Sequence, residues 1–337
     1  FEGISYTLGK DKNAIYKKEN RLSGIDPATF EEIDAAFTKD KNNIYYEDVP
    51  MKGIDPKTFE PFVNYTHVKD KNGIHHFYLF NDDLVVEKVE LSPEIDLKTL
   101  QPIENYSEYS KDKNNVYYHF QKIEGADIKT FEPEGYSIGK DKMGVYYETR
   151  KVNGVDVNSF EYLKNDFFKD KNNVYYYGNK MKGINPDGFE FVGRDFKNNE
   201  DIIYFLKTKD KVYVLKNKAG KEVYEIVPLN FDTNSFKYSN ADNSYESESV
   251  GYFQDKNGVY YFDAFRLDKL TPNNIFAKVE GADTSSFVQL MFGYAKDKNK
   301  VYIEDREIKG ADPESFKIIE TSDGVTIRDK NKIYKEF

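Results

Sequence analysis

The fold of this chain is decided by a short stretch that recurs along it, seen in one copy as Lys39-Asp40-Lys41-Asn42-Asn43-Ile44-Tyr45-Tyr46. An Asp side chain can accept hydrogen bonds from backbone amides two residues further on, and Asn enters the left-handed turn conformation at low cost. A β-branched residue and two tyrosines follow at once, and these residue types are enriched in strands. The stretch therefore predicts a hairpin turn followed by a strand.

The Asp-Lys dipeptide of this stretch occurs ten times, with its Asp at positions 11, 40, 70, 112, 141, 170, 210, 255, 297 and 329. The spacings between successive copies are 29, 30, 42, 29, 29, 40, 45, 42 and 32 residues. A fixed period of this length is typical of repeat architectures. The basic unit is therefore 29 residues long, and insertions lengthen some copies.

A second motif, Asp-x-x-Thr/Ser-Phe, alternates with the first. Its regular copies are Asp26–Phe30, Asp55–Phe59, Asp127–Phe131, Asp156–Phe160, Asp232–Phe236, Asp283–Phe287 and Asp312–Phe316, and looser copies are Asp96–Leu100 and Asn185–Phe189. In six of the nine intervals, its first residue follows the Asp of the Asp-Lys dipeptide by 15 residues, which indicates a fixed structural unit. The Ser or Thr can close a local bond to the backbone, so we expect one helical turn or a tight loop that places the Phe in the core.

These elements predict an all-β fold, a tandem array of about ten β-hairpin or three-stranded units that is elongated or superhelical. One unit cannot bury its aromatic residues alone, so neighbouring units must stack. Period-two alternation places the β-branched residue and the second Tyr on one face and the first Tyr on the other, and both faces are expected to be covered. A closed β-propeller is the alternative, although its blades usually hold four strands in about 40 residues.

The whole chain, residues 1–337, is expected to be one continuous array. Repeats are regular over residues 1–189 and 282–337 and irregular, with insertions, over residues 190–281. Since Phe1 precedes Asp11 by the same ten residues that separate Phe30 from Asp40, a truncated repeat is expected at both ends.

Three interruptions of the pattern stand out. An insertion lies around Val85–Leu91, and a polar insert with four Ser and two Glu spans Ser239–Ser249. At Asp210-Lys211 the chain continues directly into Val212-Tyr213, which indicates a copy without its two turn residues. Insertions in a repeat array are where function tends to concentrate, so the irregular zone is the place to look for it.

Composition excludes several classes of function. With 59 acidic and 49 basic residues, the net charge of -10 disfavours nucleic acid and anionic lipid as partners. The 28 Tyr and 26 Phe predict an aromatic core. The absence of Cys removes disulfides, thiolate metal sites and Cys nucleophiles. No apolar run approaches about 20 residues, so no transmembrane segment is predicted.

The string Lys-Asp-Lys-Asn-x-Val/Ile-Tyr-Tyr resembles the DKNYY family of bacterial repeat proteins, which is named after it. It stands at Lys39–Tyr46, Lys111–Tyr118 and Lys169–Tyr176, and the resemblance extends over nearly the whole chain. His75-His76 in place of Tyr-Tyr and Met143 in place of Asn depart from it. The resemblance carries no known activity, but it implies a bacterial, cell-envelope context.

Calcium is the first ligand to consider, because Asp70–Gly73 and Asp255–Gly258 have the Asp-x-Asn-Gly pattern that begins an acidic calcium loop. Such a loop needs a bidentate carboxylate at its twelfth position. Asn81 and Arg266 occupy that position here, which favours simple turns over calcium sites.

The remaining candidate groups give no defined site. The four histidines are His67, His75, His76 and His119; His75 and His76 are adjacent on a strand and should face opposite ways, so they cannot form a joint metal pair. His75 is interpreted as an aromatic substitute for the first Tyr. Exposed Tyr rows could stack on sugars, but recurrent strand Tyr is more simply packing. We therefore assign no catalytic, binding or metal residue and no cofactor.

Three functions stay open from the sequence. The first is a non-enzymatic structural or protein-interaction module of the bacterial envelope, with another protein or a surface glycan as its partner. The second is a carbohydrate-binding module that uses exposed Tyr. The third is a hydrolase with a carboxylate pair in the irregular zone. The family resemblance and the missing first half of the first repeat favour an extracytoplasmic location: the periplasm, the outer surface or the medium.

Overall fold

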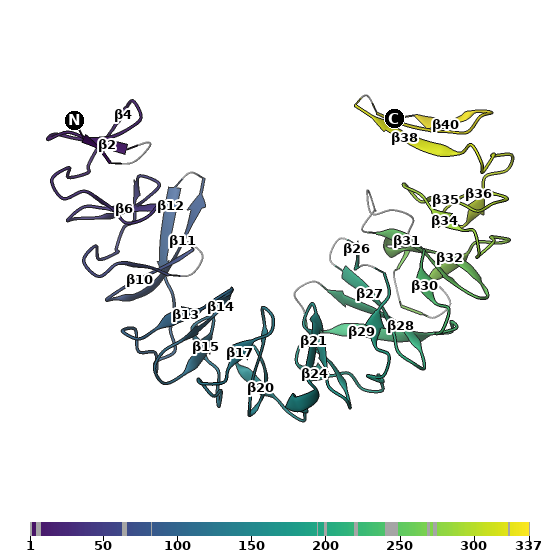
Figure 1. The fold of residues 1–337 in the computed structure, drawn as a ribbon, viewed down its shortest axis with the longest axis horizontal. Coiled ribbons are helices and arrows are strands. Elements are labelled where there is room, and N and C mark those ends of the chain that lie inside the picture. Colours follow the sequence, from purple (N-terminus) through teal and green to yellow (C-terminus); the bar gives the residue numbers. More distant parts are fainter. Residues whose placement is uncertain are drawn as a thin grey trace. The chain divides into compact units, whose positions relative to one another are not determined.

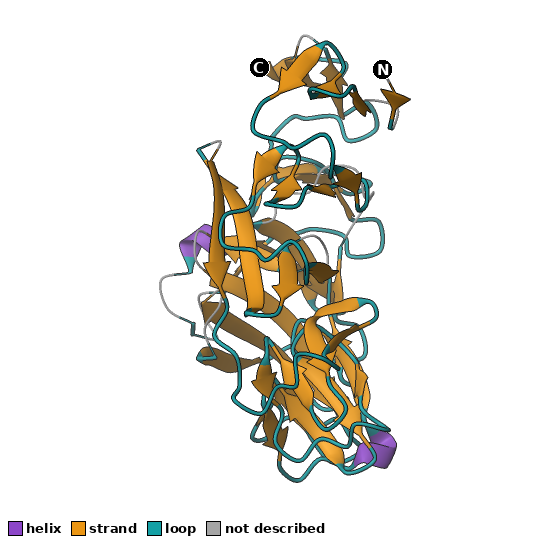
Figure 2. Cartoon of the chain, turned by 90° about the vertical axis from the view of Figure 1, so that its left-hand side faces the viewer, coloured by secondary structure: helices purple, strands orange, loops and turns teal. Residues whose placement is uncertain are grey.

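The described residues form ten small antiparallel sheets. The ribbon and cartoon views show strands and loops with very little helix (Figures 1 and 2). The computed structural model describes residues 2–4, 8–62, 66–81, 83–193, 195–198, 201–218, 222–239, 249–267, 270–271, 275–322 and 324–336. The chain forms two compact units: an N-terminal unit of Phe1–Asp170 with Tyr175–Asn179, and a C-terminal unit of Lys171–Val174 with Lys180–Phe337. Among the strands of the described residues, no sheet closes into a barrel, and the predicted all-β repeat fold is confirmed.

Five sheets of the N-terminal unit have four strands each, joined in chain order. Their strands are β1 (Glu2–Gly3), β2 (Leu8–Lys10), β3 (Ile15–Lys17), β4 (Asn20–Leu22); β5 (Glu31–Glu32), β6 (Phe37–Lys39), β7 (Ile44–Tyr46), β8 (Val49–Pro50); β9 (Glu60–Phe62), β10 (His67–Asp70), β11 (Gly73–Phe80), β12 (Asp83–Lys88); β13 (Gln101–Ile103), β14 (Tyr106–Lys111), β15 (Val116–Tyr118), β16 (Gln121–Lys122); and β17 (Glu132–Pro133), β18 (Ile138–Asp141), β19 (Gly144–Tyr147), β20 (Arg150–Val152).

The remaining sheets follow the same plan with larger departures. Their strands are β21 (Glu161–Lys164), β22 (Phe167–Lys169), β23 (Val174–Tyr176), β24 (Asn179–Lys180); β25 (Glu190–Phe191), β26 (Phe196–Asn198), β27 (Asp201–Lys207), β28 (Val212–Lys218), β29 (Tyr224–Leu229); β30 (Lys237–Tyr238), β31 (Val250–Asp255), β32 (Gly258–Asp263), β33 (Phe276–Lys278); β34 (Val288–Gln289), β35 (Tyr294–Lys296), β36 (Val301–Ile303), β37 (Arg306–Glu307); and β38 (Lys317–Thr321), β39 (Gly324–Arg328), β40 (Ile333–Glu336). In the sheet of β25 to β29, both β25 and β26 pair with β27. Two short 3₁₀ turns, η1 (Val157–Ser159) and η2 (Ala264–Arg266), are the helical elements of the described residues.

Most sheets have one strand more than the three-stranded unit that we predicted. The segment after the Phe of the second motif accounts for it: Glu31 and Glu32 form β5 and pair with Lys39 and Thr38 of β6. The second motif itself is a tight turn, closed in one copy by the bond from Thr29 N–H to the Asp26 carbonyl. A regular unit is thus a four-stranded meander, and this turn connects it to the unit before it.

Neighbouring repeats share their cores, as the alternation of the Tyr strand predicts. Val116 of one repeat packs with Tyr146 of the next, and Val145 packs in turn with Tyr175. The same arrangement joins Val259 with Tyr302 in the C-terminal unit. Because each junction takes its side chains from two repeats, no single repeat has a complete core.

The irregular zone builds the largest core of the described residues. The sheets of β25 to β29 and β30 to β33 enclose a cluster that includes Phe196, Phe205, Phe253 and Phe262, all almost fully buried. The lengthened strands β27 and β28 of this zone therefore contribute to packing. Of the polar insert predicted at Ser239–Ser249, residues 240–248 lie outside the described part of the chain.

Candidate interaction site

In most copies, the Asp of the Asp-Lys motif fastens its turn to the second motif that precedes it. One carboxylate oxygen of Asp40 accepts hydrogen bonds from the backbone N–H groups of Asn42 (2.7 Å) and Asn43 (2.8 Å), which form the turn. The other oxygen accepts from the Tyr45 hydroxyl (2.9 Å) and from the backbone N–H of Asp26 in the preceding second motif (2.8 Å). Burial opposes ionisation of Asp40, but these bonds outweigh it and hold its pKa below the ordinary value.

The Lys that follows completes the junction from outside. The Lys41 ammonium lies 2.8 Å from Asp26, and its backbone N–H donates to the Thr29 hydroxyl at 3.1 Å. This pair of contacts recurs between the Lys and the preceding second motif at Lys71, Lys113, Lys142, Lys256, Lys298 and Lys330. Each of these second motifs thus contacts the Asp-Lys motif that follows it, even where an insertion lengthens the interval, as between Asp232 and Asp255.

The recurrent tyrosines are interior residues. The first Tyr of the strand is almost fully buried in most copies: Tyr45, Tyr117, Tyr146, Tyr175 and Tyr302. Its hydroxyl bonds to the motif Asp, as at Tyr117 and Asp112 (2.7 Å). Burial raises the pKa of Tyr117, and the Asp112 carboxylate beside it raises it further. Rings held in this way offer no open face for a sugar to stack on.

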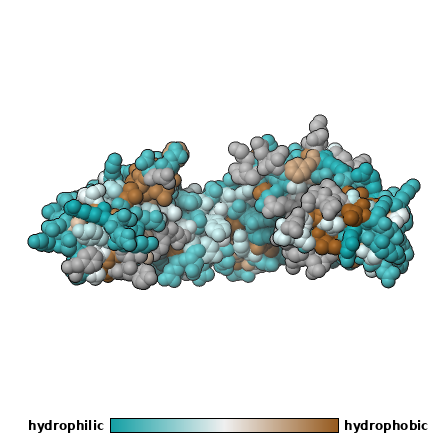
Figure 3. Space-filling view, turned by 90° about the horizontal axis from the view of Figure 1, so that it is seen from above, coloured by the Kyte–Doolittle hydropathy of each residue, from teal (hydrophilic) through white to brown (hydrophobic). Residues whose placement is uncertain are grey.

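One hairpin of the N-terminal unit exposes apolar side chains. The strands β11 and β12 are longer than their counterparts in the neighbouring repeats and end in Tyr78, Leu79 and Phe80, which are 38%, 57% and 62% exposed. Leu84 and Val86 return toward the core of the preceding repeat. In Figure 3 an apolar patch lies over this hairpin, which is labelled in Figure 1. Contiguous exposed apolar residues are a common feature of interaction surfaces.

The outer strand of this hairpin has a free side. β12 is the last strand in the order β12, β11, β10, β9 and pairs with β11 through registers such as Tyr78 with Val85 and His76 with Glu87. The hairpin arises from the insertion that widens the Asp70 to Asp112 spacing to 42 residues. It is thus the strongest candidate site among the residues described.

A family model confirms the kinship that the motif indicates. The model of the DKNYY family matches residues 8–150, 140–287 and 270–336, which together cover almost the whole chain. The chain belongs to the DKNYY family. Neither the curated proteins nor the solved structures contain a match to it.

One copy of the DKNYY motif is displaced from its predicted position. Asp210 is exposed, and the buried turn residue is Thr208, whose backbone N–H bonds to the Lys211 carbonyl as that of Asp40 bonds to Asn43. The Thr208 hydroxyl accepts from the backbone N–H groups of Asp210 (3.3 Å) and Lys211 (3.1 Å). The prediction that this copy lacks its turn residues was wrong, because Thr takes the place of Asp two residues earlier.

The histidines of the DKNYY chain fall into two settings. His75 is buried with its Nε2 3.0 Å from Asp70, so it occupies the place of the first Tyr, as we interpreted it. His67 and His76 are cross-strand partners with ring centroids 4.9 Å apart, a pairing that we had not predicted. Burial, together with smaller contributions from the charges of His76 and His119, lowers the pKa of His67 to about 4.

The two Asp-x-Asn-Gly turns carry no calcium geometry. Asp70 and Asp255 both direct their carboxylates to their own turn amides and to the preceding motif. Among the described residues, no group of His, Asp or Glu is arranged to hold a metal ion. The described part of the chain likewise contains no helix with the length and hydropathy needed to cross a bilayer.

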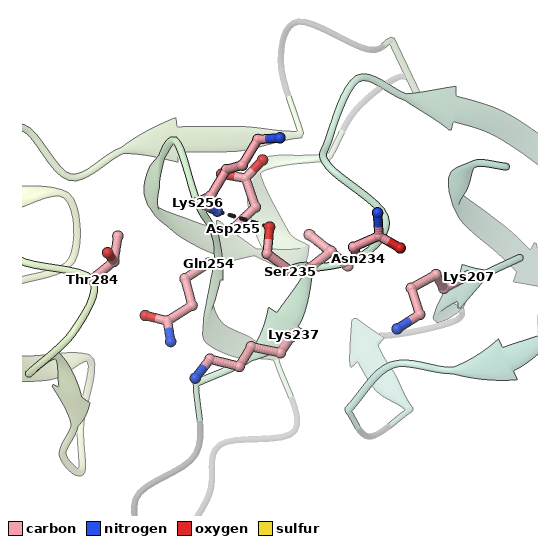
Figure 4. Close-up of a pocket in the computed structure, with 9 residues that line it drawn as sticks. Lys207, Asn234, Ser235, Lys237, Gln254, Asp255, Lys256 and Thr284 are labelled. Atoms are coloured by element: carbon pink, nitrogen blue, oxygen red, sulfur yellow. Dashed lines mark hydrogen bonds between the residues drawn. The ribbon is translucent and has the colours of Figure 1, made fainter. Parts of the chain in front are cut away.

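A pocket of about 510 Å³ lies in the irregular zone, where a hydrolase site was one alternative. Its wall contains Lys207, Lys237 and Lys256, and Asp255 is its one carboxylate. Figure 4 shows Lys237 and Lys256 pointing in different directions and the bond from the Lys256 backbone to Ser235 (3.0 Å). Since the Asp255 carboxylate is taken up by the turn, the lining offers no facing carboxylate pair for glycoside hydrolysis.

Proposed function

We propose that this DKNYY chain is a non-enzymatic protein-interaction module, displayed on the bacterial envelope or secreted, that docks another protein through the hairpin of β11 and β12. The observation that carries the proposal is the exposure of three consecutive apolar side chains, Tyr78, Leu79 and Phe80. Other large exposed apolar residues of the described chain, such as Tyr136 and Val223, stand singly. The family context supports the location.

The repeat architecture suits this role. Buried Asp, Tyr and β-branched residues hold the junctions, so the array can present a surface without a catalytic cleft. The hairpin breaks the repeat pattern at the point where an insertion occurs, and insertions are the part of an array that can change without disturbing the stacking. An apolar tip on a firmly held base supplies the desolvated centre that protein interfaces need.

The test starts from a photo-reactive amino acid placed at Phe80 in the full-length chain, in the cells that produce it. The partner captured there is identified by mass spectrometry and purified, and its affinity is measured directly. The double variant Leu79→Ser/Phe80→Ser should weaken binding by about tenfold or more.

Tyr136→Ser is the matched control, because Tyr136 is a large exposed aromatic residue of the same unit, 73% exposed, but stands alone. It should leave the affinity unchanged. If Leu79→Ser/Phe80→Ser and the unaltered chain bound the captured partner with equal affinity, the proposal would be refuted.

A further inference from the structure

The outer strand β12 differs from the strands in the same position of other repeats. The fourth strands β4, β8, β16, β20, β24, β33 and β37 have two or three residues each, whereas β12 has six. The outer strand β29 is as long, but it contains Pro228. Short length and Pro are the usual means by which proteins protect a sheet edge from pairing with another chain. β12 has neither protection.

The two faces of β12 have different surroundings. Alternation places Leu84 and Val86 toward the core cluster that also contains Phe77. Asp83, Val85 and Glu87 lie on the other face, opposite Phe80, Tyr78 and His76 of β11. A strand added to this edge would therefore continue two different rows: an apolar row on the core side and an acid, apolar, acid row on the outer side.

A second copy of the same chain fits this edge poorly. In an antiparallel pair of two identical strands, related by a twofold axis and centred on Val85, Asp83 of each copy lies opposite Glu87 of the other. Like charges directly opposite each other destabilise a strand pair. Centring the pair on Val86 instead sets Val85 opposite Glu87 and Leu84 opposite Lys88, which pairs apolar with charged side chains. Both registers argue against self-association.

The charges of the outer row indicate which sequence would fit. A residue opposite Asp83 and another opposite Glu87 should be basic, and the residue between them on that face should be apolar to cover Val85 and Tyr78. Resting on the proposed docking role of this hairpin, we propose that β12 binds an extended segment of a partner protein as an added strand, with basic side chains on either side of an apolar one. Main-chain hydrogen bonds supply affinity and the alternate side chains supply specificity.

The experiment uses the full-length chain and two fluorescent peptides of equal length. In the first, Lys flanks Val at alternate positions among Thr residues; in the second, Glu replaces each Lys. Anisotropy should show binding of the Lys peptide and binding at least about tenfold weaker of the Glu peptide. Equal affinity for the two peptides, or no binding of the Lys peptide, overturns the inference.

Two variants locate the contact. Val86→Pro removes a backbone donor of β12 that faces away from β11, because the Val89 N–H bonds to the Ile74 carbonyl and alternation then turns the Val86 N–H outward. This variant should weaken binding of the Lys peptide by about tenfold or more, whereas Glu225→Lys in the Pro-containing β29 should leave that binding unchanged. Asp83→Lys/Glu87→Lys should reverse the preference in favour of the Glu peptide, and this variant needs no backbone change. If Leu79→Ser/Phe80→Ser abolishes binding of the native partner while Val86→Pro leaves it unchanged, the edge is not used and the docking role of the tip stands.

Discussion

Two lengthened hairpins, β11–β12 in the N-terminal unit and β28–β29 in the C-terminal unit, show that the same kind of insertion can end in opposite ways. In β28, Val212, Val214 and Leu215 are fully buried, and Val212 and Val214 belong to the large core of the irregular zone. In β11, Leu79 and Phe80 extend beyond the packed part of their sheet and stay exposed. The difference teaches that neighbouring elements, more than the insertion itself, decide whether an added hairpin builds core or surface.

The largest effect that this comparison predicts is at the centre of the irregular zone. Phe205 contacts the rings of Phe196, Phe253, Phe262 and Phe276 and is 1% exposed. Phe205→Ala should lower the free energy of unfolding of the C-terminal unit by about 3 to 5 kcal/mol. Chemical denaturation measures it. Phe80→Ala, a change of the same size in the exposed hairpin, should change stability by less than about 0.5 kcal/mol.

A second prediction contrasts a regular turn with the displaced one. Asp40→Ala removes the acceptor for three backbone N–H groups and the Tyr45 hydroxyl, so it should cost about 2 to 4 kcal/mol. Asp210→Ala should cost less than about 0.5 kcal/mol, because Thr208 fills that role in its repeat. Equal losses in thermal unfolding of the two variants would show that the assignment of Thr208 is wrong.

Acid should weaken the two units over different ranges of pH. Because the folded pKa of His67 is about 4, below its ordinary 6.5, folding favours the neutral imidazole. The free energy of unfolding of the N-terminal unit is therefore highest above about pH 6.5 and decreases as the pH falls toward 4. The decrease should be about 1 to 2 kcal/mol, because His67 is partly exposed and solvent reduces the effect.

The four histidines all lie in the N-terminal unit, so the C-terminal unit should not respond in this window. The motif carboxylates of the C-terminal unit, such as Asp297, have lowered pKa values, because hydrogen bonds outweigh the opposing effect of burial. Their protonation should therefore reduce the stability of this unit only below about pH 4. Measurements of unfolding at a series of pH values should therefore distinguish the two units. His67→Phe should abolish the loss of stability of the N-terminal unit between pH 6.5 and 4. A midpoint in that window that persists in His67→Phe would contradict the assignment.

The sequence was sufficient for the parts of the fold that depend on local chemistry. The Asp-Lys-Asn turn, the Tyr strand and the burial of both its faces follow from side-chain type and period-two alternation, and Tyr45 and Ile44 lie where these rules place them. The contact between the two motifs was not predicted, because it joins Asp26 to the Asp-Lys motif 14 residues after it, whereas the constant spacing of 15 residues relates Asp26 to the motif before it.

The candidate site was harder to predict, for physical reasons. An insertion was evident from the long interval after Asp70, but whether Leu79 and Phe80 would be covered depends on neighbouring sheets and not on the local pattern. The pairing of His67 with His76 could have been derived from the turn, because a hairpin that pairs Asp70 with Gly73 also pairs residues three further out on each strand. Thr208 was not predicted, because in this repeat a hydroxyl replaces the carboxylate as acceptor of the turn amides, and the Asp-Lys dipeptide lies two residues later.

The smallest expected effect on stability tests the edges of the two hairpins. Pro228 of β29 lies opposite Tyr213 of β28, and a Pro is tolerated in a sheet where its missing N–H would face away from the partner strand. Pro228→Thr should therefore change the free energy of unfolding by less than about 0.5 kcal/mol while it restores an outward donor. Sedimentation should then reveal concentration-dependent association of the variant, which Val86→Pro in β12 should not show. A stability gain above about 1 kcal/mol would mean instead that the restored N–H bonds to β28, and that Pro228 does not protect this edge.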